Sequence, residues 1–88
     1  METYKINTSI EDFIEANKAV EVDIIEGCLI DNFLLQTDTE VIFLKETYQN
    51  CWTSIYTVYR STDHNEIYGM WEAFERAIEE NQEGSTKQ

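Results

Sequence analysis

Carboxylates are the side chains of this chain whose number and spacing could do chemistry. There are 18 Asp and Glu residues against 6 Lys and Arg, which gives a formal net charge of −12 at pH 7 over 88 residues. Clustered carboxylates can hold a hard cation, or they can present negative charge to a basic partner. Which of these applies depends on where the helices and strands place them.

One group of carboxylates lies in the C-terminal part of the chain. At 100° per residue, one helix would carry a band beside its apolar face that consists of Tyr68, Glu72, Glu75, Glu79 and Glu83. Helical residues three or four apart lie about 5–6 Å from each other. That distance is comparable with the spacing of phosphates along nucleic acid, which is about 3.4 Å per step on one strand and longer between alternate phosphates. The band predicts either a mimic of nucleic acid with Tyr68 as its anchor or an ordinary solvated helix face.

A second group lies near the expected turn and wet face of a sheet and consists of Asp31, Asp38, Glu40 and Glu46. A calcium loop needs ligands at alternating positions with a central glycine, and the segment TDTE at 37–40 is too short and has none. We therefore expect no metal here. The group predicts a second acidic patch for the same basic partner.

No residue pattern predicts catalysis. His64 is the only histidine, and it is expected to be a surface residue at a helix start. The chain has no GxSxG motif, and its three glycines, Gly27, Gly69 and Gly84, form no phosphate-binding loop. Cys28 and Cys51 are expected to be buried, reduced thiols. We expect a protein that is not an enzyme and has no catalytic residue, cofactor or metal.

Aromatic residues form a further candidate surface. Alternation along a strand places Trp52 and Tyr56 on one face of a sheet and Tyr59 on the other, with Tyr48 nearby. If helices cover only one face, the aromatic residues on the other face form a binding platform or a homodimer seam. If helices cover most of the sheet, these residues belong to the core.

Hydrophobic periodicity places these groups on helices and strands. A short helix is expected from a cap at Thr8 or Ser9 to about Lys18, after a polar lead-in with an edge strand through Tyr4 and Ile6. Val20, Val22 and Ile24 alternate with acidic residues and predict a strand with one wet face. Residues 28–37 fit a central strand better than a helix, which stays an alternative.

The second half of the chain contains the strongest patterns. Residues 40–60 predict two strands with a turn near Gln49-Asn50, and the sheet they form is what the rest of the chain is built around. A capping box at Asp63 opens a long amphipathic helix to about Asn81, whose apolar arc consists of Ile67, Trp71, Phe74 and Ile78.

These elements predict one α+β domain over residues 1–88, in which residues 82–88 form a frayed polar tail. The expected architecture is an antiparallel β-meander of three to four strands. An N-terminal helix and a long C-terminal amphipathic helix would pack on one face of it.

The charge excludes two classes of partner. Binding to DNA or RNA phosphates requires Lys and Arg, and an anionic membrane surface repels this chain for the same reason. The sequence has neither an apolar run long enough to cross a membrane nor an apolar signal-peptide core at its start, METYKINTS. We expect a cytoplasmic protein with a basic partner.

In size, acidity and expected α/β build, the chain resembles a broad class of small acidic phage and mobile-element proteins that inhibit nucleases. This class includes type II anti-CRISPR proteins, uracil-DNA glycosylase inhibitors and restriction inhibitors. The resemblance implies DNA mimicry, in which the two acidic groups block the nucleic-acid channel of a partner enzyme. Two alternatives remain open, an immunity or antitoxin protein that caps a basic toxin site and a regulatory module that forms a homodimer.

Overall fold

The computed structural model describes residues 1–26, 31–50 and 53–86, with side chains described for residues 1–26, 31–47 and 55–80. Its elements are, in chain order, β1 (Glu2–Ile6), α1 (Ile10–Asn17), β2 (Val20–Glu26), β3 (Asp31–Gln36), β4 (Val41–Asn50), β5 (Thr53–Ser61) and α2 (His64–Thr86). The expected turn at Gly27 and the thiols of Cys28 and Cys51 lie outside the described residues.

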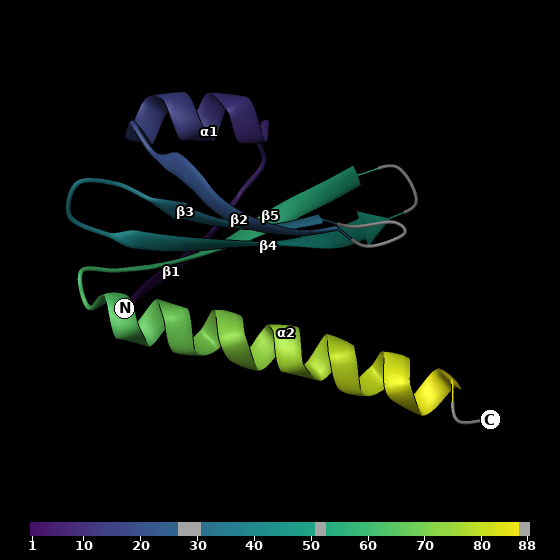
Figure 1. Ribbon diagram of the computed structural model, residues 1–88. Coiled ribbons are helices and arrows are strands. Elements are labelled where there is room, and N and C mark those ends of the chain that lie inside the picture. The colour runs from purple at the N-terminus through teal and green to yellow at the C-terminus, as the bar shows by residue number, and fades with distance from the viewer. Residues whose placement is uncertain (27–30, 51–52, 87–88) are drawn as a thin grey trace.

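The strands form one five-stranded antiparallel sheet in the order β1-β5-β4-β3-β2. The α+β class and the antiparallel meander are therefore confirmed, and the N-terminal segment adds an edge strand beside β5. Since β1 and β2 lie at opposite edges, the chain between them has to cross the sheet, and α1 lies over the face that it crosses (Figure 1).

The two helices lie on opposite faces of the sheet, whereas the sequence predicted that both would cover the same face (Figure 1). On the α1 side, Phe13 packs against a cluster that includes Leu35 and Leu44. On the α2 side, Ile67 and Trp71 pack against a cluster that includes Phe43. The physical reason is that β3 and β4 are apolar on both alternations, so each face of the sheet needs a cover.

Local signals explain where α1 begins and ends. The Ser9 Oγ accepts a hydrogen bond of 3.1 Å from the Asp12 backbone N–H, so Ser9 rather than Thr8 is the cap. Lys18 adopts the left-handed conformation with φ of 52°, and the following Ala19 N–H donates to the Ile14 carbonyl. A left-handed residue followed by a hydrogen bond back to the last turn is a common way for a helix to end, and β2 follows directly.

A β-bulge changes which side chains of β2 face inward. The pairing with β3 shifts between Glu21 and Asp23, so Val22 is the additional residue. As a result Val20 and Val22 are exposed, although the sequence predicted that they face the core together with Ile24. Beyond the bulge, Asp23 turns toward α2, where its Oδ2 accepts a hydrogen bond of 3.2 Å from the Trp71 indole N–H.

The long helix α2 ends at Thr86, later than the expected end near Asn81. Within the described ranges, neither helix has the length and apolar content that a membrane span requires.

Candidate binding surface

Three predicted carboxylates gather along one side of α2. The side chains of Glu72 and Glu79 are exposed and that of Glu75 is half-buried. They are three and four residues apart, so they lie on neighbouring turns of one helix side. We call Glu72, Glu75 and Glu79 the α2 acidic band. The side chain of Glu83, the fourth expected carboxylate, lies outside the description.

Tyr68 is placed differently from the exposed anchor that the sequence predicted. Its ring is half-buried and packs against the core on the α2 side of the sheet. Its hydroxyl donates a hydrogen bond of 3.3 Å to the Gln36 Oε1 at the end of β3. Tyr68 therefore helps to hold α2 against the sheet.

A small open pocket of about 130 Å³ connects the acidic band with the edge of the sheet. Ile25 of β2 and Ile78 of α2 provide its apolar walls, and Glu75 and Glu79 provide its carboxylates. Apolar surface rimmed by carboxylates suits a Lys or Arg side chain, whose aliphatic stem can be buried while its charged head stays at the rim.

The predicted carboxylates of the sheet do not form one patch with the band. Asp31 begins β3 and is half-buried, and its backbone N–H donates a 2.7 Å hydrogen bond to the Glu46 Oε1. The Glu46 N–H in turn donates to the Oδ1 of buried Asn32 at 3.0 Å, so side chains continue the β3–β4 ladder here. Asp38 is exposed in the turn between β3 and β4.

Asp31 and Glu46 share the α1 side of the sheet with Tyr56. Burial raises the pKa of the Tyr56 hydroxyl, and the negative charges of Glu46, Asp31 and Glu11 raise it further. This cluster stabilises a neutral phenol among carboxylates. Across the described part of the chain, no three His, Cys, Asp or Glu side chains are grouped so that they could hold a metal ion.

Glu40 is an ion-pair partner, although the sequence predicted that it belongs to a free acidic patch. Its two carboxylate oxygens accept hydrogen bonds from Arg60, at 2.6 Å from Nη2 and at 3.1 Å from Nε. Hydrogen bonding to Arg60 and its positive charge keep the pKa of the Glu40 carboxyl below its ordinary value, against an opposing effect of burial. Glu40 therefore has little charge left to offer a partner.

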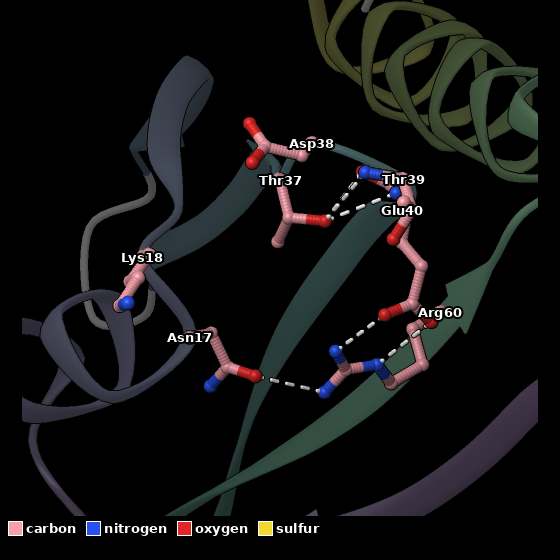
Figure 2. Close-up of a pocket in the computed structure, with 7 residues that line it drawn as sticks. All are labelled: Asn17, Lys18, Thr37, Asp38, Thr39, Glu40 and Arg60. Carbon is pink, nitrogen blue, oxygen red and sulfur yellow. Dashed lines mark hydrogen bonds and ion pairs between the residues drawn. The ribbon is translucent and has the colours of Figure 1, made fainter.

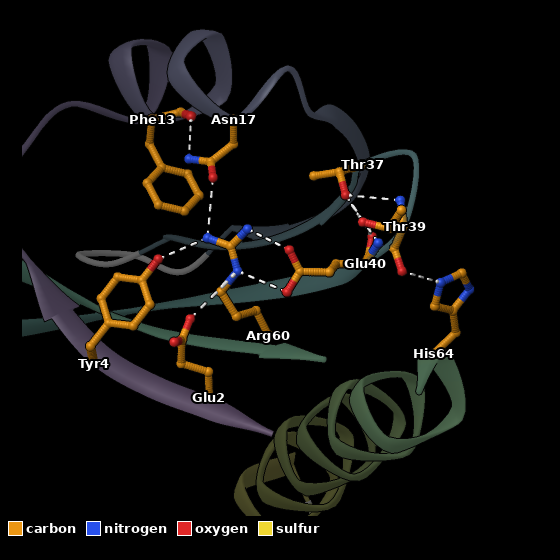
Figure 3. Close-up of polar contacts among 9 residues, drawn as sticks. All are labelled: Glu2, Tyr4, Phe13, Asn17, Thr37, Thr39, Glu40, Arg60 and His64. Atoms are coloured by element: carbon orange, nitrogen blue, oxygen red, sulfur yellow. Dashed lines mark hydrogen bonds and ion pairs between the residues drawn. The ribbon is translucent and has the colours of Figure 1, made fainter. Parts of the chain in front are cut away.

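The Arg60 side chain ties together four segments that are far apart in the sequence, and no sequence pattern indicated this role. Its Nη1 donates to the Tyr4 hydroxyl at 2.8 Å and to the Asn17 Oδ1 at 3.1 Å, in addition to its bonds with Glu40 (Figure 3). Only 14% of the side chain is exposed. The hydrogen bonds to Glu40 are the main reason that the pKa of Arg60 is raised.

An open polar pocket of about 350 Å³ lies beside this ion pair (Figure 2). Thr37 closes its turn by accepting hydrogen bonds from the backbone N–H groups of Thr39 and Glu40. Arg60 lines the pocket, but its donors already bind Glu40, Tyr4 and Asn17. The Asn17–Arg60 hydrogen bond in this pocket ties α1 to β5, so the guanidinium serves the fold here.

His64 is the first residue of α2, in agreement with its expected place at a helix start. Its Nε2 lies 3.2 Å from the Thr39 carbonyl oxygen, which links the helix to the β3–β4 turn.

The described aromatic residues belong to the two cores and leave no aromatic platform. Tyr56 packs against the cluster on the α1 side, and Tyr59 packs on the α2 side with its ring centroid 5.7 Å from that of Phe43. The side chains of Tyr48 and Trp52 are outside the description. A homodimer seam built on exposed Tyr56 or Tyr59 is thus not supported.

No family model, no curated protein and no solved structure matches this chain. The function has to be inferred from the chain's own surface.

The Glu40–Arg60 pair predicts how stability depends on pH, and the net charge of −12 predicts how it depends on salt. The pKa of Glu40 is lowered from an ordinary 4.5, so its contribution is present above that value and is lost as pH falls through the lowered pKa.

Thermal unfolding at constant ionic strength from pH 3 to 8 should therefore show that stability is lost as pH falls below the ordinary carboxyl value of 4.5. Added NaCl at pH 7 should raise the melting temperature, because salt screens the repulsion. The melting temperature of the Glu40→Gln variant should fall less in acid than that of the wild-type protein. An equal loss of melting temperature in acid for the wild-type protein and the Glu40→Gln variant would contradict the contribution of the Glu40–Arg60 pair.

Proposed function

We propose that this protein is an acidic inhibitor that binds the nucleic-acid-binding surface of a basic enzyme, such as a nuclease, and presents carboxylates in place of phosphates. The observation that supports this proposal is the α2 acidic band. Its carboxylates, of which Glu72 and Glu79 are exposed and Glu75 is half-buried, repeat along one side of a helix that the core holds in place through Ile67 and Trp71. The proposal includes a place in the cytoplasm, that of a host cell if a phage carries the gene.

The distribution of basic side chains supports the same proposal. Arg60 is already paired with Glu40, and the other basic residues with described side chains are Lys5, Lys18, Lys45 and Arg76. Of these, Arg76 lies on α2 between Glu72 and Glu79 and is exposed. A basic enzyme would approach this protein along a strongly favourable electric field, which accelerates association at low salt.

The proposal is tested by capturing partners from a host lysate at low salt, eluting them with a salt gradient and identifying them by mass spectrometry. We expect a basic nucleic-acid-binding enzyme that DNA displaces in competition. A captured toxin that DNA does not displace would instead favour the immunity or antitoxin function.

Charge-neutral variants then locate the contact. The triple variant Glu72→Gln, Glu75→Gln and Glu79→Gln should bind the captured enzyme at least about tenfold more weakly, a loss of about 1.4 kcal/mol or more. The matched control Glu11→Gln, Asp12→Asn and Glu15→Gln removes the same charge from exposed positions of α1, on the opposite face of the sheet. It should change the affinity by about threefold or less, since distant charges act mainly on association rates.

The Arg76→Gln variant should act in the opposite direction and tighten binding, because it removes an exposed basic side chain that lies between Glu72 and Glu79 on α2. If the α2 and α1 triple variants weaken binding equally, the band has no special role and only net charge matters.

A further inference from the structure

The strand β2 is an open edge of the sheet. It pairs with β3 on one side, and no described strand pairs with its other side. An edge strand presents unpaired backbone N–H and C=O groups, to which an extended chain can add as a further strand.

Two valines add exposed apolar surface to this edge. The exposed fractions are 63% for Val20 and 46% for Val22, and apart from Met1 these are the exposed large hydrophobic residues among the described side chains. Proteins usually protect edge strands with Lys, Pro or a bulge. The sequence of β2, VEVDIIE, contains neither Lys nor Pro, and only the bulge at Val22 interrupts it.

The charge of β2 determines which strand can pair with it. It carries Glu21, Asp23 and Glu26 and no basic residue. Like charges directly opposite each other destabilise a strand pair, so pairing with β2 of a second copy is disfavoured, whereas Lys and Arg on the incoming strand are favoured. The other edge strand, β1, lacks this bias because Lys5 balances Glu2.

The pocket beside Ile25 would receive one of the basic side chains. Ile25 lies on the side of β2 that faces α2, where it packs with the α2-side core. Alternate residues of an added strand would point to this side, next to the pocket formed with Ile78, Glu75 and Glu79. A Lys or Arg stem could cover the isoleucines while its head meets the carboxylates.

We infer that β2 and this pocket form one docking site for an extended basic segment of the partner, which adds to the sheet as a sixth strand and places a Lys or Arg between Glu75 and Glu79. The inference rests on the proposed function only in taking the partner to be basic. It does not require that the partner bind nucleic acid.

The direct test uses a capped seven-residue peptide of alternating Lys and Val as the probe. Binding should slow hydrogen exchange of β2 backbone amides and shift the NMR signals of Glu75 and Glu79. The same peptide with N-methylated amides along one edge keeps its charge but cannot form the strand ladder, and it should bind at least about tenfold more weakly. If both peptides bind equally, or if the signal changes spread over all acidic surfaces, only charge attracts the probe and the docking site is refuted.

Two pairs of protein variants separate charge from position. Glu75→Gln with Glu79→Gln should weaken peptide binding at least about threefold at 150 mM salt, where distant charges are screened. The matched pair Asp12→Asn with Glu15→Gln on α1 should leave binding unchanged. Equal losses from the two pairs would contradict a basic side chain in the pocket.

Val22→Pro tests strand addition with the captured enzyme, because proline is tolerated at bulges and edge strands and leaves the charge unchanged. Provided that circular dichroism shows a folded protein, this variant should weaken binding about tenfold. Unchanged binding, together with displacement by DNA, would refute the docking site and leave the proposed function intact. Lost binding without displacement by DNA would support the docking site and refute nucleic-acid mimicry.

Discussion

Replacing Trp71 with alanine should lower the unfolding free energy by about 3–5 kcal/mol, the usual range for removing a large buried aromatic side chain. Trp71 is 3% exposed, and its ring meets Phe43 edge-on with 5.0 Å between centroids. A chain of 88 residues has a total stability of only about 4–13 kcal/mol. The melting temperature should therefore fall by about 12 °C or more.

The same substitution should weaken partner binding, because Trp71 holds the helix that carries the acidic band. Trp71→Phe keeps most of the packing and loses the hydrogen bond to Asp23, so it should lower the unfolding free energy clearly less than Trp71→Ala does. Tyr68→Phe, which removes only the hydroxyl contact with Gln36, should cost about 1 kcal/mol or less. Urea unfolding of the three variants gives the comparison. A Trp71→Ala loss no larger than that of Tyr68→Phe would show that α2 is held elsewhere.

The helices were largely predictable because their signals are local. Ser9 and Lys18 mark the two ends of α1, and the arc of Ile67, Trp71, Phe74 and Ile78 identifies the buried side of α2. Which face of the sheet each helix covers was harder to predict. The apolar run Phe33–Leu35 indicated a strand that is buried on both faces. Only the three-dimensional path of the chain shows that α1 covers one face and α2 the other.

The exposure of Val20 and Val22 could not be read from alternation, since a bulge without Gly or Pro leaves no clear signal in the sequence. One additional residue reverses the face of every side chain before it. The alternation of β2 is typical of a half-buried strand, so it did not indicate that the open edge carries exposed valines.

The Glu40–Arg60 pair was missed because it depends on hairpin register. A turn at Gln49-Asn50 would pair Ile42 with Thr57, whereas in the structure Ile42 pairs with Arg60, three residues further along. The hairpin also has a register shift between Tyr48 and Asn50. With the observed register, Glu40 lies diagonally across from Arg60, within reach of a long side chain.

Replacing Arg60 with methionine should lower the unfolding free energy by about 2–4 kcal/mol. Methionine keeps the aliphatic stem but leaves the Glu40 carboxylate without its counterion and removes the hydrogen bonds to Tyr4 and Asn17. Removing one partner of a buried ion pair costs about 3–5 kcal/mol, and the partial exposure of Glu40 reduces this figure. Arg60→Lys keeps the charge but not the two-pronged contact, so its loss should be intermediate.

The double variant with Glu40→Gln decides whether the pair is the cause. If the ion pair carries the effect, Arg60→Met should cost much less in the Glu40→Gln background, with a coupling energy of about 1–3 kcal/mol in urea unfolding at pH 7. A coupling near zero would mean that Arg60 acts through its other contacts, with Tyr4, Asn17 and Glu2. The Glu40 charge would then be free, and Glu40 would return to the set of carboxylates that a basic partner can contact.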